Sequence, residues 1–342
     1  MNVHEAREIG RRWIQDNRAA VPGYCGAIFS GSSLYFSRNR DWPTGSDLDI
    51  NMYQINPGKP LAARKIPVDG VVLEISCRDF REVSDPRTVL AAAYVAPQFY
   101  RMKPVDDPYG LLAPVHRMIR EHYTDPRWVR ERLRAVRRKA AWNYRTVIDA
   151  TDASVFGKIH RFIGGVHNTA VLLAVANFGN PTLRRCLAVS DIALHKCGAP
   201  ALQEELLGIL GSRELPEDTV RRHLEQMSPL FDRALACHKT PFWCDRELFP
   251  ENKAKLWTGV MDMIDEGHHR EAVFFLFFMH HCFQNAIRKD GTKRDKARYV
   301  PLFDQLAELN GLTDYDCCRQ RAHAGLKVLD RVYKKAKELL PE

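Results

Sequence analysis

The sequence predicts an α+β protein in which a mixed sheet with flanking helices is followed by an all-helical domain. Two observations support this prediction. Short alternations typical of strands recur before Gly110 and nearly vanish after it. Beyond that residue, apolar positions recur with the spacing of amphipathic helices. We therefore expect an α+β domain over residues 1–110 and an all-α helical-bundle domain over residues 111–342.

Local signals place the elements of the first domain. Pro22-Gly23 ends the first helix, and Asp69-Gly70 is typical of a tight turn between two hairpin strands. Asp85-Pro86 supplies a cap and a first-position proline for a later helix. The expected elements are helices over 3–20, 33–40 and 86–94, and strands over 27–30, 47–54, 62–67 and 71–77.

The second domain is predicted from helical periodicity and proline-containing starts. Asp125-Pro126 and Asn180-Pro181 repeat the cap-plus-proline pattern. The segment 268–288 is apolar nearly all round, so we expect it to be the central helix. The expected helices cover 126–145, 152–176, 181–196, 201–210, 216–238, 251–264, 268–288 and 314–339.

Two aspartates and a Gly-Ser turn are the first candidate functional residues. Asp47 and Asp49 are two residues apart on a predicted strand, so their side chains point to the same face. Adjacent carboxylates repel each other unless a cation lies between them, and Mg²⁺ prefers such oxygen ligands. The turn at Gly31, Ser32 and Ser33 offers backbone N–H groups to phosphate.

Glu74 is the third candidate carboxylate. It alternates with Leu73 and Ile75 in a strong strand pattern, so it points away from their face. If this strand lies beside the strand of Asp47 and Asp49, Glu74 joins the same cluster. There it either ligates a metal ion or accepts the proton of an attacking hydroxyl group.

The order Gly31-Ser32, Asp47-Leu48-Asp49 and a later strand with Glu74 resembles the nucleotidyltransferase superfamily of DNA polymerase beta. It is most similar to the small bacterial branch that includes kanamycin nucleotidyltransferase. The segment 103–110, Lys-Pro-Val-Asp-Asp-Pro-Tyr-Gly, resembles the end of the catalytic domain in that branch. The fourteen residues between Ser32 and Asp47 exceed the spacing usual in the family.

The resemblance implies a metal-dependent nucleotidyltransferase. Such an enzyme moves a nucleoside monophosphate, here AMP from ATP as the favoured pair, to an acceptor hydroxyl group and releases pyrophosphate. Asp47, Asp49 and Glu74 would hold one or two Mg²⁺ ions, with Mn²⁺ as a substitute. The resemblance also implies an aminoglycoside-like small-molecule acceptor and a homodimer.

Two alternatives to a small acceptor stay open. One is a nucleotidyltransferase that acts on RNA or on a protein hydroxyl group. The other is a nucleotide-binding regulatory module without transfer activity, against which the intact set of three acids argues.

Positive charge is concentrated in one segment of the chain. The formal net charge is +9, and residues 111–145 contain ten Lys and Arg against three Asp and Glu. The predicted helix from Arg127 to Arg145 carries much of this excess. Its basic face either binds triphosphate, RNA or another polyanion, or is a solvated face of an amphipathic helix.

Membrane and disulfide-rich classes are not expected. The longest apolar run, Ala272–Met279, is too short to cross a bilayer, and the N-terminus lacks the apolar core of a secretory signal. The nine cysteines show no framework spacing. The sequence therefore predicts a cytoplasmic protein without a membrane partner.

Overall fold

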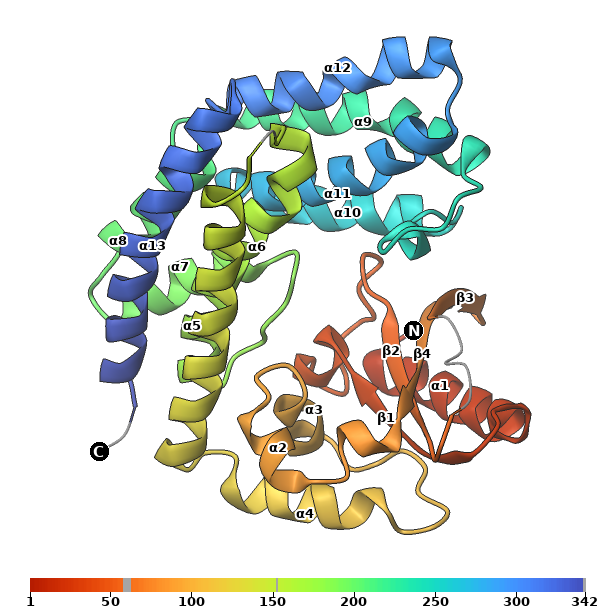
Figure 1. Cartoon of the computed structure of the whole chain (residues 1–342). Coiled ribbons are helices and arrows are strands. Elements are labelled where there is room, and N and C mark those ends of the chain that lie inside the picture. Colours follow the sequence, from red (N-terminus) through yellow and green to blue (C-terminus); the bar gives the residue numbers. More distant parts are fainter. Residues whose placement is uncertain (58–62, 152, 341–342) are drawn as a thin grey trace. The chain divides into compact units, whose positions relative to one another are not determined.

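The computed structural model describes residues 1–57, 63–151 and 153–340, and it has the predicted α+β architecture (Figure 1). A four-stranded mixed sheet lies in the N-terminal part of the chain, and helices make up the remainder. The chain divides into two compact units, Met1–Ala135 and Val136–Leu340. None of the described helices is long and apolar enough to cross a membrane.

The sheet has the strand order β1-β2-β4-β3. Its strands are β1 (Tyr24–Ser30), β2 (Leu48–Gln54), β3 (Arg64–Val68) and β4 (Val71–Asp79). β2 is antiparallel to β1 and parallel to β4, whereas β3 is antiparallel to β4. The predicted start of the third strand at Ala62 lies outside the described residues.

The predicted hairpin between β3 and β4 is confirmed. Val68 pairs with Val71 across a two-residue turn. Asp69 and Gly70 in this turn have φ angles of 47° and 82°, and positive angles at both positions suit the twist of a two-residue hairpin. The turn therefore fixes which residues of the two strands lie opposite each other.

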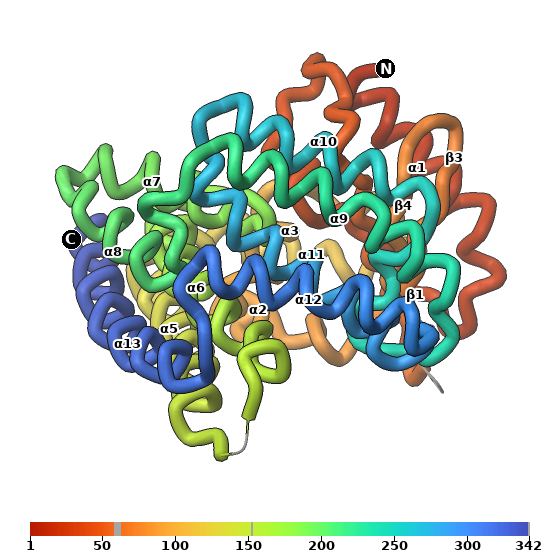
Figure 2. The backbone as a smooth tube through the Cα atoms, turned by 90° about the horizontal axis from the view of Figure 1, so that it is seen from above, coloured from red at the N-terminus to blue at the C-terminus, as the bar shows by residue number. Residues whose placement is uncertain are grey.

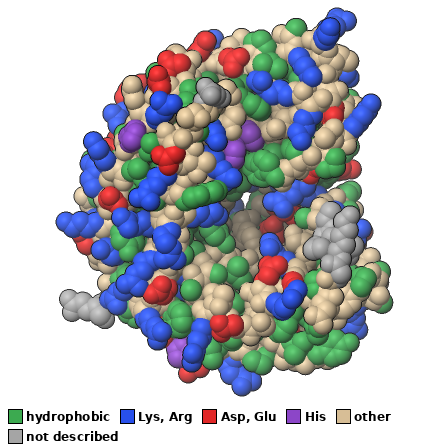
Figure 3. All heavy atoms as spheres, viewed as in Figure 1, with side chains coloured by type: hydrophobic (Ala, Val, Ile, Leu, Met, Phe, Trp, Pro, Cys, Tyr) green, Lys and Arg blue, Asp and Glu red, His purple; other side chains and the backbone are tan. Residues whose placement is uncertain are grey.

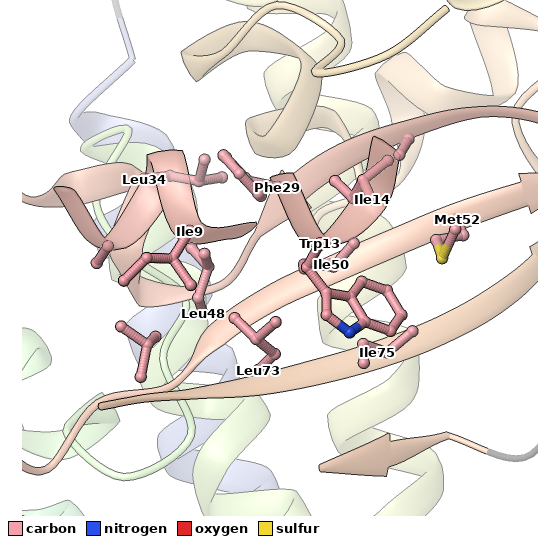
Figure 4. Packing of buried hydrophobic residues seen from close by; sticks show 13 residues of the cluster. Ile9, Trp13, Ile14, Phe29, Leu34, Leu48, Ile50, Met52, Leu73 and Ile75 are labelled. Atoms are coloured by element: carbon pink, nitrogen blue, oxygen red, sulfur yellow. The ribbon is translucent and has the colours of Figure 1, made fainter. Parts of the chain in front are cut away.

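One face of the sheet packs on helix α1 (Val3–Asn17). The helix contributes residues such as Trp13 and Ile14, and β2 contributes Leu48, Ile50 and Met52. Figure 4 shows these side chains between the helix and the strands. Because strand residues alternate, burying Leu48 and Ile50 on this face turns Asp49 to the other face.

The rest of the first unit consists of short helices. They are η1 (Arg18–Ala20), η2 (Ser32–Tyr35), η3 (Phe80–Glu82), α2 (Pro86–Ala91), α3 (Ala96–Arg101) and α4 (Leu112–His122). The predicted cap of α2 is confirmed, since the Asp85 carboxylate accepts from the backbone N–H groups of Arg87 and Thr88. This helix ends three residues earlier than predicted, and α3 was not predicted.

The predicted helix over residues 33–40 is wrong. Only the single turn η2 forms, and its C-cap residue Phe36 is already extended. The carbonyl groups of Arg38 and Arg40 instead accept from the first N–H groups of α1, those of His4 and Val3. This segment thus pairs with the start of α1 and does not continue a helix of its own.

The first compact unit extends beyond Gly110: α4 packs on α2 and α3, and the start of α5 (Pro126–Ile148) is hydrogen-bonded to it. Arg132, whose side chain is fully buried, links α5 to the rest of this unit. Its guanidinium donates to the carbonyl oxygens of Leu90 at 2.9 Å and Tyr123 at 2.7 Å. It also lies 4.2 Å from the centroid of the Tyr123 ring.

The described secondary structure of the second unit consists of helices alone. After α5 come α6 (Val155–Ala176), α7 (Cys186–Lys196), α8 (Ala201–Leu210), α9 (Glu217–Cys237), η4 (Asp245–Glu247), α10 (Asn252–Asp265), α11 (His269–Asp290), α12 (Lys293–Leu309) and α13 (Tyr315–Glu338). The buried helix α11 packs against α6, α9, α10 and α12, which confirms it as the central helix. Figure 2 shows α9 and α12 side by side.

Two predictions for this unit need correction. Helix α7 begins at Cys186 and not at Pro181, because the Thr182 carbonyl accepts from His167 Nε2 at 3.3 Å before the helix starts. Helix α12 was not predicted, since Pro301 interrupts its pattern, yet a capping box between Thr292 and Asp295 starts it. The predicted start at Asp152 lies outside the described residues.

Candidate functional site

The three predicted acids lie together on the face of the sheet that α1 does not cover. Asp47 directly precedes β2, Asp49 lies in β2, and Glu74 is the direct partner of Asp49 in β4. Carboxylate oxygens of all three lie within 4.8 Å of one another. The structure thus brings together the side chains that strand alternation predicted on one face.

A lysine that sequence reasoning missed joins two of these acids. Lys65 Nζ lies 3.1 Å from Asp47 Oδ2 and 3.1 Å from Glu74 Oε2. Its side chain is only 3% exposed, so the ion pairs are shielded from water. The cluster therefore contains three carboxylates and one ammonium group, with a formal charge of −2.

The position of Lys65 could have been predicted from the hairpin turn. With Asp69 and Gly70 as the two turn residues, counting outward along both strands places Lys65 opposite Glu74, as the structure has it. Directly paired residues have side chains on the same face. The position of Lys65 beside Glu74 was therefore encoded in the hairpin register.

Gly31 brings the turn against the acids. Its φ of 68° and ψ of −157° lie in a region that is essentially restricted to glycine. A Cβ atom at this position would lie 1.8 Å from Asp49 Oδ2. Glycine is therefore required both for the backbone conformation and for the close approach to the carboxylate.

Ser32 and Ser33 differ in what they offer at this turn. Ser33 is fully buried, and its hydroxyl group donates to the Ser30 carbonyl at 3.2 Å. Its carbonyl accepts from Arg7 Nη2 at 2.5 Å. The Ser33 side chain therefore serves the turn itself, while Gly31 and Ser32 lie on its more exposed side.

The donor set fits a hard divalent cation. Three carboxylates from two adjacent strands present oxygen ligands at close range, which is the chemistry that Mg²⁺ and Mn²⁺ require. Lys65 orients Asp47 and Glu74 from one side. Asp47, directly before β2, and Asp49, within it, would form the primary ligands.

A second group of possible metal ligands lies in the helical unit. Asp191, His268 and Glu271 also place ligand atoms within 4.8 Å of one another. Gln203 donates to Glu271 Oε1 at 3.2 Å, and His195 pairs with Asp191 at 3.0 Å. These contacts give the group a structural explanation, and it provides a control for metal-binding experiments.

Helix α5 has the basic face that the sequence predicted. Its buried face consists of Val129, Leu133, Val136, Ala140 and Tyr144. Its exposed face carries Arg127, Arg130, Arg134, Arg138 and Arg145, with Trp142 beside them. Figure 3 shows Lys and Arg side chains gathered over α5.

The arginines of this face differ in their partners. Arg134 pairs with Glu131 at 2.6 Å, whereas Arg130, Arg138 and Arg145 have no acidic partner among the described residues. Trp142 is 51% exposed, and the Arg161 guanidinium of α6 lies over one face of its ring, 4.3 Å from the centroid. The face thus combines uncompensated guanidinium groups with an exposed aromatic ring.

Comparisons with known proteins add a distant structural likeness. A scan against protein families finds no match, and neither does a search of curated proteins. Among solved structures, the chain is similar to a nucleotidyltransferase-like protein from Exiguobacterium sibiricum 255-15. The two share 13% identity with a TM-score of 0.33, over 75% of this chain and 90% of that chain. Values this low assign no activity to this chain and no role to its residues.

Proposed function

We propose that this protein is a metal-dependent nucleotidyltransferase that moves a nucleoside monophosphate, AMP in the favoured case, from its triphosphate to an acceptor hydroxyl group. Pyrophosphate is the second product. The observation that carries the proposal is the convergence of Asp47, Asp49 and Glu74 beside the glycine-restricted turn at Gly31. Metal ligands next to a phosphate-binding turn are the groups that phosphoryl-type transfer requires.

Each side chain has a distinct role in this proposal. Asp47 and Asp49 bind Mg²⁺, which when bound neutralises charge on the phosphate oxygens. The backbone of Gly31 and Ser32 donates to phosphate oxygens of the nucleotide. Glu74 lies beside Asp49, where it either ligates the ion or accepts the proton of the acceptor hydroxyl group.

The charge of the cluster favours one bound ion over two. With Lys65 in place, the formal charge of −2 is balanced by a single divalent cation. The same ammonium group engages one oxygen each of Asp47 and Glu74, which restricts the geometry of both carboxylates. We therefore propose that Lys65 replaces part of the charge of a second ion.

Two classes of acceptor have specific support in this chain. The resemblance of the sequence suggests a small molecule similar to an aminoglycoside. The basic face of α5 favours RNA instead, because unpaired arginines bind phosphates and an exposed tryptophan can stack on a base. A cationic aminoglycoside gains nothing from that face, so the charge distribution supports RNA as the second candidate.

The proposal is tested by incubating the protein with labelled ATP, CTP, GTP or UTP and Mg²⁺ across small hydroxyl acceptors and RNA. We expect one pair of substrates to show transfer that depends on the metal ion. Asp49→Asn should fold normally by circular dichroism but lose this activity. Asp191→Asn, in the second acidic group, should retain it.

Two results would count against the proposal. Full activity in Asp49→Asn would contradict the assignment of the acidic cluster as the active site. Absence of both transfer and Mg²⁺-dependent nucleotide binding in the natural protein would remove the function itself.

A further inference from the structure

A second polar site of the first unit lies on α1. It is a pocket of about 240 Å³ lined by His4, Arg7, Arg11, Arg38 and Met102. His4, Arg7 and Arg11 follow one another at helical spacing on one face of α1. No carboxylate is among the lining residues. A concave site with three guanidinium groups attracts anions.

Hydrogen bonds hold the arginines of this pocket in place. Arg38 Nη2 donates to His4 Nε2 at 2.8 Å, and His4 Nδ1 lies 3.5 Å from Glu8 Oε1. Arg11 forms an ion pair with the same Glu8 oxygen. One carboxylate outside the lining therefore positions two of the three guanidinium groups, and the pocket keeps a net positive charge.

Arg7 is the least compensated of the three arginines. Its Nη2 donates to the Ser33 carbonyl, but its Nε is buried without a hydrogen-bond partner among the described residues. Burial lowers the pKa of the Arg7 guanidinium, and the nearby charge of Arg11 lowers it further. Both effects disfavour the cation, so a bound anion would stabilise it.

We propose that this pocket binds a phosphate group, either of free phosphate or pyrophosphate or at the end of a nucleoside triphosphate. Guanidinium groups match phosphate oxygens with paired hydrogen bonds, and several of them suit a multiply charged anion better than a single carboxylate. Arg7 connects the pocket to the Ser33 carbonyl and hence to the turn at Gly31. The nucleotide version rests on the proposed function, and the free-anion version does not.

The test measures binding of pyrophosphate, phosphate and ATP by calorimetry, without Mg²⁺. Arg38→Gln and Arg11→Gln should each weaken pyrophosphate or ATP binding about tenfold, the effect of losing one charge-assisted hydrogen bond. Arg12→Gln is the matched control, because Arg12 lies on the same helix, is 66% exposed and lies near Asp69, outside the pocket. It should bind as the natural protein does.

Competition separates the two sources of phosphate. If the pocket holds the end of a nucleotide, pyrophosphate competes with ATP, and Arg38→Gln weakens ATP binding but not AMP binding. If it holds a free anion, pyrophosphate and ATP bind together, and Arg38→Gln leaves ATP affinity unchanged. Either outcome supports a phosphate site.

Repeating these titrations with Asp49→Asn separates the pocket from the proposed active site. Binding that persists in this variant and is lost on adding Arg38→Gln belongs to the pocket, whether or not the protein transfers nucleotides. Equal affinities of the Arg38, Arg11 and Arg12 variants for pyrophosphate and for ATP would overturn the proposal.

Discussion

Lys65 is the residue on which the acidic cluster depends for its stability. Its removal would leave Asp47 and Glu74 close together and largely buried, with side chains 15% and 13% exposed. We predict that Lys65→Met lowers the free energy of unfolding by about 3 kcal/mol, the cost of breaking a buried ion pair. Denaturant unfolding monitored by circular dichroism measures this loss.

Added Mg²⁺ provides a second measurement on the same variant. A divalent ion can take over the neutralising role of the missing ammonium group, so it should raise the Tm of Lys65→Met more than that of the natural protein. Lys65→Arg keeps the charge and should be destabilised less. Equal responses of all three proteins to Mg²⁺ would show that the ion does not take over the role of the ammonium group.

A substitution at Gly31 can separate the collision of a methyl group with Asp49 from the strain of a positive φ angle. Gly31→Ala should abolish transfer, because its Cβ would collide with Asp49 Oδ2. It should also cost about 1–3 kcal/mol of stability through the strained backbone. Gly110→Ala is the matched control, since its φ of 67° is also positive but no atom lies within 4 Å of the added Cβ.

The comparison between the two glycine variants is informative in either direction. Both should lose stability in denaturant, and only Gly31→Ala should lose Mg²⁺-dependent activity. Retained activity in Gly31→Ala would mean that the position of Asp49 does not matter for the reaction.

Among the helices, α5 shows how one element is anchored through a buried cation. Arg132→Met would retain much of the side-chain volume but leave the Leu90 and Tyr123 carbonyls without their donor. We predict a loss of about 2–4 kcal/mol in unfolding free energy, since each unsatisfied buried group costs about 1–3 kcal/mol. The exposed variant Arg134→Met should change stability by less than about 0.5 kcal/mol.

The basic face of α5 can be tested by the salt dependence of RNA binding. Changing Arg130, Arg138 and Arg145 together to Gln should reduce the slope of log affinity against log salt by about 2, for three lost contacts to a single strand. Arg137→Gln is the control, because Arg137 already pairs with Asp330 at 2.7 Å. An unchanged slope in the triple variant would mean that these arginines do not bind RNA and only form the solvated face of the helix.

Strand elements and their faces could be predicted because alternation is a local property. Asp47 and Asp49 were placed on one face from their spacing, and the hairpin was predicted from Asp69-Gly70. Glu74 was predicted to join them only if its strand lay beside theirs, which the parallel pairing of β2 with β4 provides. The structure of the segment after Ser33 could not be predicted, because its carbonyl groups accept hydrogen bonds from α1, more than 30 residues away in sequence. Arg132 was indistinguishable from its exposed neighbours, because its acceptors lie in other elements.

On the scale of the whole molecule, buried histidines make the helical unit sensitive to acid. Burial lowers the pKa of His160, His167 and His223 to about 4 and that of His281 to about 3. Unfolded histidine has a pKa of about 6.5, so between these values the unfolded chain binds more protons than the folded one. Stability is therefore full above about pH 6.5 and falls as the pH drops toward 4.

Thermal unfolding between pH 7.5 and 4.5 measures this effect. We expect the Tm to fall across this range, and limited proteolysis at pH 5 to cut within Val136–Leu340 first. Replacing His223 by Gln removes one of the titrating groups and should flatten the profile. A Tm that is constant between pH 6.5 and 4.5 would contradict the prediction.

Because the turn at Asp69-Gly70 has two residues, the position of Lys65 depends on whether a change in the length of this hairpin is odd or even. Inserting or deleting one residue there would bring Arg64 or Ile66 opposite Glu74 and turn Lys65 to the other face of the sheet, unless a bulge absorbed the change. A change of two residues could keep Lys65 in place. We therefore expect variants with two residues inserted or deleted in this turn to stay active. Variants with one residue inserted or deleted should lose activity, because the Lys65 ammonium group leaves the acidic cluster.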